Sequence, residues 1–202
     1  MFSRVKRLIV LGVVLGVLLG GFVFGLTVLY PMRYNEIIRR YAEKFDLPVE
    51  LVYAVIHTES RFRYDVVSPR GASGLMQVVR GTADWIAGEI GIENYSYDRI
   101  FEPEINIAIG AWYLRYLINR FDGEIDTALA AYNAGPTTVR RWLNNPDFSS
   151  DGRTLHTIPY GETKRYVERV NNAMPIYRNL INLLNGALMP LFERLAVFSP
   201  LN

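Results

Sequence analysis

The sequence predicts an all-α protein in which one helical domain follows a single N-terminal transmembrane helix. Three observations support this: residues 8–30 are 23 consecutive positions without a charge, apolar residues then recur at intervals of three and four, and no stretch alternates as strands do. The chain has 202 residues, 50% of them apolar, which is enough to bury one core. Cysteine is absent, which excludes disulfides, zinc knuckles and thiol catalysis.

The N-terminal segment predicts a membrane anchor. As a helix, residues 8–30 would be about 35 Å long, which is enough to cross a bilayer. Residues 1–7 carry three cations and no acid, which places them in the cytoplasm and sends the rest of the chain to the outer side of the cell membrane. The apolar run ends in bulky residues and offers no small-residue cleavage site. We therefore expect an uncleaved, single-pass anchor, with a cleaved signal peptide as the alternative.

The outer part of the chain is nearly neutral. Residues 1–30 hold three cations and no acid, so removing them from the overall charge of +2 leaves −1. Phosphate backbones are bound by clustered positive charge, which such a domain lacks. Nucleic acid is therefore not an expected partner.

Helices joined by short loops are expected after Pro31. The first covers residues 34–45, and Pro48 opens the second at its first position, where its missing N–H costs nothing. Further helices are expected at about 82–90, 105–121, 125–134, 137–144 and 162–184. Residues 144–159 are rich in turn formers and predict a surface loop. The helical domain is assigned to residues 31–180, and an apolar tail, 181–202, either packs on it or lies on the membrane.

A single carboxylate stands out in the second of these helices. Glu59 follows Val52, Val55 and Ile56 by seven, four and three residues, so the four side chains share one helix face. Burial raises the pKa of a carboxyl group and can keep it protonated near neutral pH, as a general acid requires. From the helix alone, the alternative is an ordinary glutamate that reaches solvent or pairs with a nearby arginine.

His57 does not predict a metal site. With Glu59 it forms the His-x-Glu that begins the zinc deaminase signature, but the cysteines of that signature are absent. On a helix of 3.6 residues per turn, His57 points about 160° away from Glu59. A surface or supporting role is expected for it, and no metal or other cofactor is predicted.

The loop after this helix has the residues of a ligand-binding turn. Gly71 and Gly74 free the backbone for a tight turn or close approach. Gln77 adds an amide donor and a carbonyl acceptor, which suit an N-acetyl group or sugar hydroxyls. A structural loop that tucks apolar residues into the core would look the same.

A second candidate region is AAYNAGP, residues 130–136. Gly135 ends one helix and Pro136 begins the next, so Tyr132 and Asn133 occupy the last turn before a corner. We expect the Tyr132 hydroxyl to hydrogen-bond the Glu59 carboxyl, and Asn133 to anchor the corner or hold a sugar. The alternative is a plain connection between two helices.

Four motifs occur in order over residues 34–180: Glu59-Ser60, Gly74-Leu75-Met76-Gln77, Ala131-Tyr132-Asn133-Ala134-Gly135-Pro136, and Ile158-Pro159 followed by Glu162-Thr163 and Tyr166-Val167. Together they resemble the lysozyme-like catalytic domain of the soluble lytic transglycosylase family, which is related to goose lysozyme and cleaves bacterial peptidoglycan. The resemblance implies that Glu59 is the only catalytic acid/base. It also implies that substrate-binding residues surround it: Ser68, Gln77, Tyr132, Asn133 and Tyr166.

The resemblance further implies a mechanism with one carboxylate, whereas most glycosidases use two. Glu59 would protonate the β-1,4 glycosidic oxygen between N-acetylmuramic acid and N-acetylglucosamine. As a base, it would then activate the muramyl C6 hydroxyl, which closes a 1,6-anhydro ring without water. Peptidoglycan strands are thus the expected partner.

Two alternatives stay open. A hydrolase of goose-lysozyme type would use a water molecule, which Asp65 or Asp84 could position, although a loop acid and a helix cap are simpler interpretations of those residues. A non-catalytic glycan-binding scaffold would anchor cell-wall synthesis proteins through residues 8–30. The presence of Glu59, Gln77 and Tyr132 argues against the scaffold, because binding alone does not need the acid.

Overall fold

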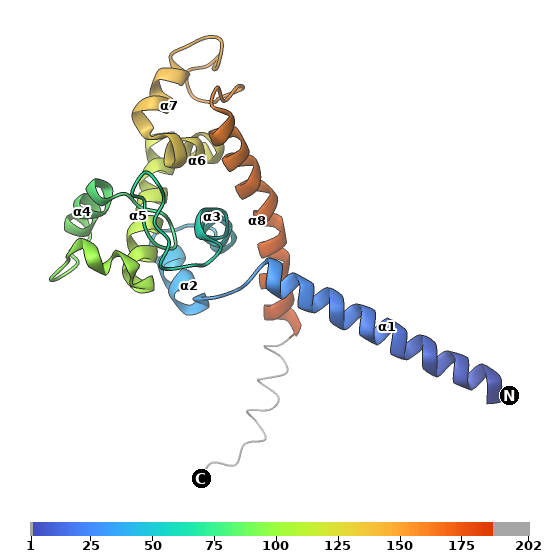
Figure 1. Ribbon diagram of the computed structural model, residues 1–202. Coiled ribbons are helices and arrows are strands. Elements are labelled where there is room, and N and C mark those ends of the chain that lie inside the picture. The colour runs from blue at the N-terminus through green and yellow to red at the C-terminus, as the bar shows by residue number, and fades with distance from the viewer. Residues whose placement is uncertain (1, 188–202) are drawn as a thin grey trace. The chain divides into compact units, whose positions relative to one another are not determined.

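The computed structural model describes residues 2–187, which fall into two units that meet between Arg33 and Tyr34. The first unit holds α1 (Phe2–Leu29), drawn in dark blue in Figure 1. Its segment Val5–Leu29 has a mean hydropathy of 2.7 and buries none of its most apolar window. By length and composition, this helix can cross a membrane.

The second unit is built from helices, which confirms the all-α prediction. They are α2 (Asn35–Lys44), α3 (Val49–Ser60), α4 (Arg80–Glu89), the 3₁₀ helix η1 (Tyr97–Phe101), α5 (Pro103–Arg120), α6 (Ile125–Ala134), α7 (Pro136–Leu143) and α8 (Gly161–Ala187). Within residues 2–187 no strand forms, and only two isolated β-bridges occur, from Ser73 to Val67 and to Val78. The predicted helices are all present, whereas η1 was not predicted.

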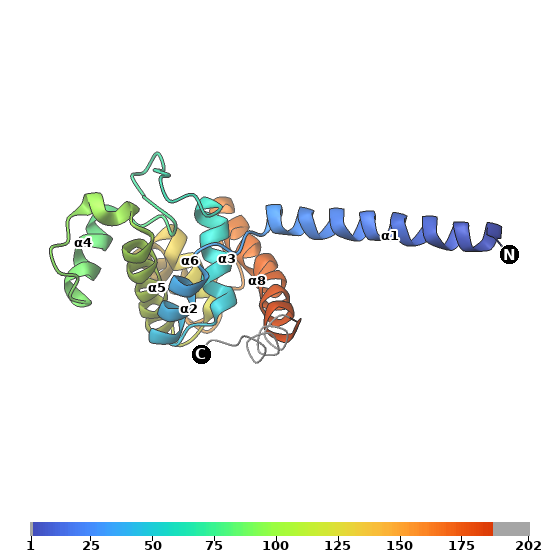
Figure 2. The same cartoon turned by 90° about the horizontal axis from the view of Figure 1, so that it is seen from below.

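Helix α3 lies at the centre of the second unit. It packs against α2 and most extensively against α8, and Figures 1 and 2 show it between these two helices. Every residue from Leu51 to Ile56 is fully buried. The apolar face predicted for Val52, Val55 and Ile56 is therefore real, but neighbours also cover the rest of the helix, so its hydrophobic residues do not form a single stripe.

Helix ends agree with the turn chemistry, with small corrections. Gly135 has φ +86 and separates α6 from α7, which starts at Pro136. Pro48 is the residue before α3 and not its first helical residue. Helix α4 starts two residues earlier than predicted, at Arg80, and α8 runs to Ala187 with Pro175 inside it.

The loop between α7 and α8 is irregular, as predicted. The Asp151 carboxylate organises it by accepting the backbone N–H groups of Arg153 and Thr154, each at 2.8 Å. This loop leads into Tyr160 and the start of α8, which border the site described below. The predicted apolar tail begins inside α8, and its part from residue 188 onward lies outside the described residues.

Candidate active site

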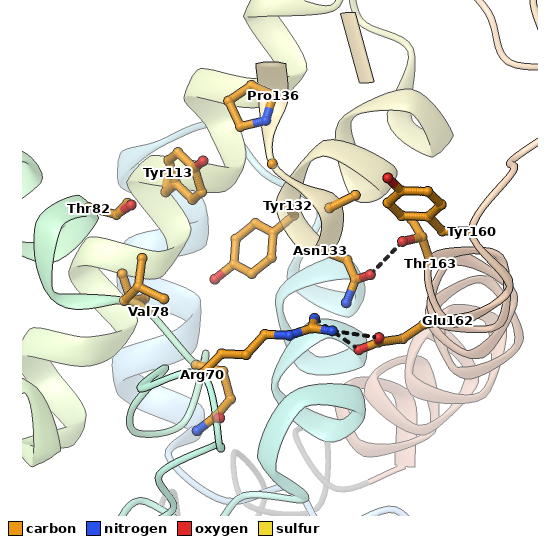
Figure 3. Close-up of a pocket in the computed structure, with 14 residues that line it drawn as sticks. Arg70, Val78, Thr82, Tyr113, Tyr132, Asn133, Pro136, Tyr160, Glu162 and Thr163 are labelled. Atoms are coloured by element: carbon orange, nitrogen blue, oxygen red, sulfur yellow. Dashed lines mark hydrogen bonds and ion pairs between the residues drawn. The ribbon is translucent and has the colours of Figure 1, made fainter. Parts of the chain in front are cut away.

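Glu59 stands in the last turn of α3 and lines a cleft made of two adjoining hollows. The Glu59 hollow, of about 410 Å³, also holds Ser68. The Tyr113 hollow, of about 480 Å³, extends toward α4 and α7 and is shown in Figure 3. Six residues line both hollows: Arg70, Gln77, Val79, Tyr132, Asn133 and Glu162. The cleft thus brings together five of the six predicted site residues, from α3, α6 and the loop between α3 and α4.

The Glu59 carboxyl is only partly exposed, and its surroundings favour the protonated form. Burial raises its pKa from an ordinary value of 4.5 to about 7. The Tyr166 hydroxyl and the Arg169 charge lower this pKa, and Glu162 raises it. Among the described residues, no arginine or lysine pairs with Glu59 within 4 Å, so the interpretation of a salt-bridged helix-end glutamate is wrong.

Tyr132 does not donate to Glu59 as predicted. Its hydroxyl donates to the Met76 carbonyl oxygen at 2.8 Å, and a phenol has only one proton to give. The ring is still close to the acid: burial raises the pKa of Tyr132 well above 10.0, and the charge of Glu59 raises it further. Tyr132 therefore ties α6 to the loop beside Glu59.

Tyr166, and not Tyr132, is the phenol whose hydroxyl lowers the pKa of the Glu59 carboxyl. Its side chain is 1% exposed and lines neither hollow, so the prediction that it lines the cleft is wrong. The hydroxyl lies beside Glu59 and lowers the pKa of that carboxyl, although the two groups do not have the geometry of a formed hydrogen bond. Because α8 packs along α3, Tyr166 reaches the acid from within the protein.

Gln77 uses its amide donor to hold its own loop. Its Nε2 donates to the carbonyl oxygens of Val66 at 3.0 Å and Gly74 at 2.8 Å, and its backbone has φ +49. Only the side-chain oxygen is left to accept from a ligand. Ser68 also supports the loop, since its Oγ accepts the Ala72 N–H at 3.0 Å.

Asn106 is a buried support for the loop that was not predicted from the sequence. Its Oδ1 accepts the Met76 N–H at 2.7 Å, and its Nδ2 donates to Ser73 and Ile100 carbonyl oxygens at 3.0 and 2.9 Å. Gly74, at φ +79, leaves the space that the amide fills, because a Cβ there would collide with Asn106. The available signal was an amide residue inside the otherwise apolar run of α5.

Two contacts tie α8 to the cleft, and Figure 3 shows both. The Thr163 hydroxyl donates to the Asn133 Oδ1 at 2.8 Å, which leaves the Asn133 amide nitrogen for a ligand. Arg70 donates to both Glu162 carboxylate oxygens, at 3.1 and 3.4 Å, across the cleft. The side chains of this ion pair are 75% and 58% exposed. Arg70 is a site residue that was not predicted from the sequence.

The other acids considered from the sequence lie elsewhere. Neither Asp65 nor Asp84 lines the cleft, and Asp84 lies 3.8 Å from Arg80 on α4. His57 is 3.1 Å from the Tyr177 hydroxyl, which fits the predicted supporting role. In the described part of the chain, no group of three His, Cys, Asp or Glu side chains could hold a metal ion.

Known proteins share this architecture. The soluble lytic murein transglycosylase of Escherichia coli K12 is 38% identical over 143 residues, which is 70% of this chain and 22% of that protein. The membrane-bound lytic murein transglycosylase C of Yersinia pestis is 32% identical over 169 residues, which is 72% of this chain and 47% of that protein. The chain thus spans less than half of either relative.

Solved structures agree with the sequence relatives. The lytic transglycosylase Slt of Pseudomonas aeruginosa superposes with a TM-score of 0.70 and 34% identity over 78% of this chain and 26% of that one. The 70 kDa soluble lytic transglycosylase of Escherichia coli gives a TM-score of 0.67 and 34% identity over 75% of this chain and 25% of that one. The family model of the transglycosylase SLT domain matches residues 36–153. The chain therefore belongs to the transglycosylase SLT domain family.

Proposed function

We propose that this protein is a lytic transglycosylase of peptidoglycan. It cleaves the β-1,4 bond between N-acetylmuramic acid and N-acetylglucosamine and leaves a 1,6-anhydromuramyl end. The observation that carries the proposal is Glu59, a partly buried carboxyl that lines the cleft with a pKa of about 7. A pKa near neutral lets the group both give up and take up a proton, so it can act as an acid and as a base.

The cleft favours a mechanism with one carboxylate. Glu162 is the other acid that lines it within the described residues, and both of its oxygens accept from Arg70. While Arg70 donates to both oxygens, Glu162 is engaged in an ion pair, and Glu59 is the carboxyl in the cleft that no cation among the described residues pairs. The substrate's own C6 hydroxyl, held next to the reacting carbon, supplies the nucleophile at high effective concentration.

Three polar groups bind the glycan in this proposal. The Gln77 Oε1 accepts from a sugar hydroxyl or N-acetyl N–H, because the Gln77 amide donors are already in use. The Asn133 amide nitrogen and the Ser68 hydroxyl donate, since each accepts one intramolecular bond and donates none in the described structure. Tyr132 and Tyr166 position the loop and the acid.

The relatives support this proposal. Those at 38% and 32% identity are named as murein transglycosylases, and the Pseudomonas aeruginosa structure is described as an inactive mutant in which glutamate is replaced by glutamine. The hydrolase alternative is disfavoured because Asp65 and Asp84 do not line the cleft.

We also propose that residues 8–30 anchor the protein in the cell membrane, with residues 1–7 in the cytoplasm and the domain facing the wall. The apolar composition of α1 and the relative named as membrane-bound support this. Cell-wall synthesis proteins are the expected protein partners of an enzyme anchored there. If the mature protein, sequenced from its N-terminus, began near residue 31, the anchor would be a cleaved signal peptide instead.

Product analysis tests the reaction. The full chain in detergent is incubated with purified peptidoglycan, and the released fragments are weighed by mass spectrometry. Anhydro products lack the water that hydrolysis adds, so we expect muramyl ends that are lighter by one water. Reducing ends from the wild type, or substantial cleavage by Glu59→Gln, contradict the proposal.

A further inference from the structure

An aromatic strip leads from the cleft to the outer surface of α4 and α5. We define the strip as Trp85, Trp112, Tyr113 and Tyr116. The Tyr113 ring lies 5.4 Å from the Tyr132 ring in the cleft and 6.3 Å from Tyr116. Tyr116 stacks on Trp112 at 5.5 Å, and Trp85 meets both of these rings edge-on, at 5.1 and 5.3 Å. The rings thus form one continuous series.

The strip is not part of the core. Trp85 is 41% exposed, and the other three rings are each partly exposed. Single exposed apolar residues are normal on a protein surface, but a contiguous group of large rings marks a surface that binds something.

The strip continues the cleft geometrically. Thr82 and Tyr113 line the Tyr113 hollow, and Figure 3 shows both on the side away from Glu162. Trp85 follows Thr82 by three residues on α4, and Tyr116 follows Tyr113 by three on α5, so each pair shares a helix face. Because α4 packs against α5, the pair on α4 lies beside the pair on α5. A ligand that extends past Thr82 and Tyr113 therefore meets the strip next.

The polar groups around the rings match a saccharide. The Trp85 indole N–H donates to Glu89 at 3.2 Å, and Arg120 donates to the Tyr116 hydroxyl at 3.2 Å, so hydrogen bonds fix the orientation of two rings. Sugar rings pack their C–H faces on aromatic rings, while their hydroxyls bond to charged groups at the rim. A purely aliphatic partner surface could not hydrogen-bond the exposed Glu89 and Arg120 beside the rings.

We propose that the aromatic strip binds further saccharide units of the glycan strand that occupies the cleft. This inference rests on the proposed function, since it assigns more of the same substrate to this surface. Trp85 is a specificity residue for strand length in this scheme and takes no part in the bond cleavage. Long strands use the strip, and fragments that fill only the cleft do not reach it.

Binding measurements on an inactive background test the strip. Peptide-free glycan strands are fractionated by length, and their affinities for Glu59→Gln in the full chain are measured in detergent by calorimetry. Adding Trp85→Ala should weaken the binding of long strands about 10-fold, which corresponds to about 1.4 kcal/mol, and leave short fragments unchanged. Trp85→Tyr should restore most of the affinity, because it keeps an aromatic face.

The matched control is Phe45→Ala. Phe45 is also a partly exposed aromatic residue, stacked on Tyr41 at 6.0 Å, but it lines neither hollow. This control should bind strands of every length as the parent does. Circular dichroism of each variant confirms that the fold is kept.

The binding and cleavage results test two proposals separately: glycan binding by the aromatic strip, and lytic transglycosylase activity. The role of the strip is overturned if Trp85→Ala binds long strands as tightly as the parent, or if it loses affinity equally for long and short strands. Normal cleavage by the wild type would still leave the proposed function intact. A length-dependent loss together with hydrolytic products supports the strip and overturns the transglycosylase mechanism. If the parent binds no strand of any length, the role of the strip fails, and the proposed function is decided by the products of wild-type cleavage.

Discussion

The raised pKa of Glu59 predicts that ionising this carboxyl lowers the stability of the folded protein. Burial shifts this pKa from 4.5 to about 7, so the folded state binds the proton more tightly than the unfolded state does. The free energy of unfolding therefore falls as pH rises from about 4.5 to about 7, and it is constant with respect to this group above that range. Glu59→Gln removes the charge and should stabilise the protein at alkaline pH.

The size of the gain follows from the same pKa. At about 1.36 kcal/mol per pKa unit, the interval from 4.5 to about 7 sets an upper limit of about 3.4 kcal/mol. Part of this cost is already present at pH 5, because the unfolded glutamate has lost most of its proton there. Glu59 also keeps some contact with solvent in the cleft, which screens its charge. We expect Glu59→Gln to raise the free energy of unfolding relative to the wild type at pH 8. This gain should be larger at pH 8 than at pH 5 by about 1 to 2.5 kcal/mol.

Urea unfolding of the full chain in detergent measures this difference. Wild type and Glu59→Gln are followed by tryptophan fluorescence at both pH values, and their free energies of unfolding are compared. Asp65→Asn serves as the control, because this exposed loop acid lines neither hollow and should give the same difference at both pH values. A Glu59→Gln gain that does not depend on pH would show that burial does not raise the pKa of Glu59.

The other predictions concern the surroundings of the acid. Wild-type kcat/KM should fall as pH rises above about 7, where Glu59 loses its proton, and a pH profile of peptidoglycan cleavage measures the midpoint. Tyr166→Phe should move that midpoint to higher pH, because the hydroxyl that lowers the pKa of Glu59 is lost, and a shift to lower pH would contradict this. Glu162→Gln should move it to lower pH, since a neighbouring negative charge is removed. Gly74→Ala should destabilise the fold by about 2 kcal/mol or more in urea unfolding, because its φ is +79 and its Cβ would collide with Asn106; stability equal to wild type would show that the loop adapts.

The sequence predicted the elements well because helical periodicity and turn chemistry are local. Glu59 on the face of Val52 and Val55 is a consequence of spacing within one helix, and Gly135 ends α6 because only a few residues on either side matter. Contacts between side chains of different helices depend on tertiary packing and cannot be predicted in this way. Tyr132 and Tyr166 are both phenols near the acid, and nothing within α6 or α8 tells which hydroxyl faces Glu59. That depends on how α8 packs along α3.

The same limit applies to the loop that carries Gln77. From the sequence, its amide could donate to a ligand, whereas in the structure it donates to Val66 and Gly74. Gln77 has φ +49, and its side chain folds back on its own loop. The adjoining Met76 N–H is held by Asn106, which comes from a helix thirty residues later in the chain. A motif identifies the residue type but not which of its atoms are still free.

The cleft is held partly by buried contacts and partly by an exposed ion pair. Tyr132 and the fully buried Asn106 amide hold the Met76 backbone from α6 and α5, and Glu59 is fixed by the enclosed helix α3. The Arg70–Glu162 pair is the contact that crosses the cleft in the open, with both side chains mostly exposed. An exposed ion pair contributes about 0 to 1 kcal/mol, so these two side chains can adjust to an entering ligand at little cost. The acid and its loop are thus held by buried contacts, which is the arrangement that the proposed positioning catalysis requires.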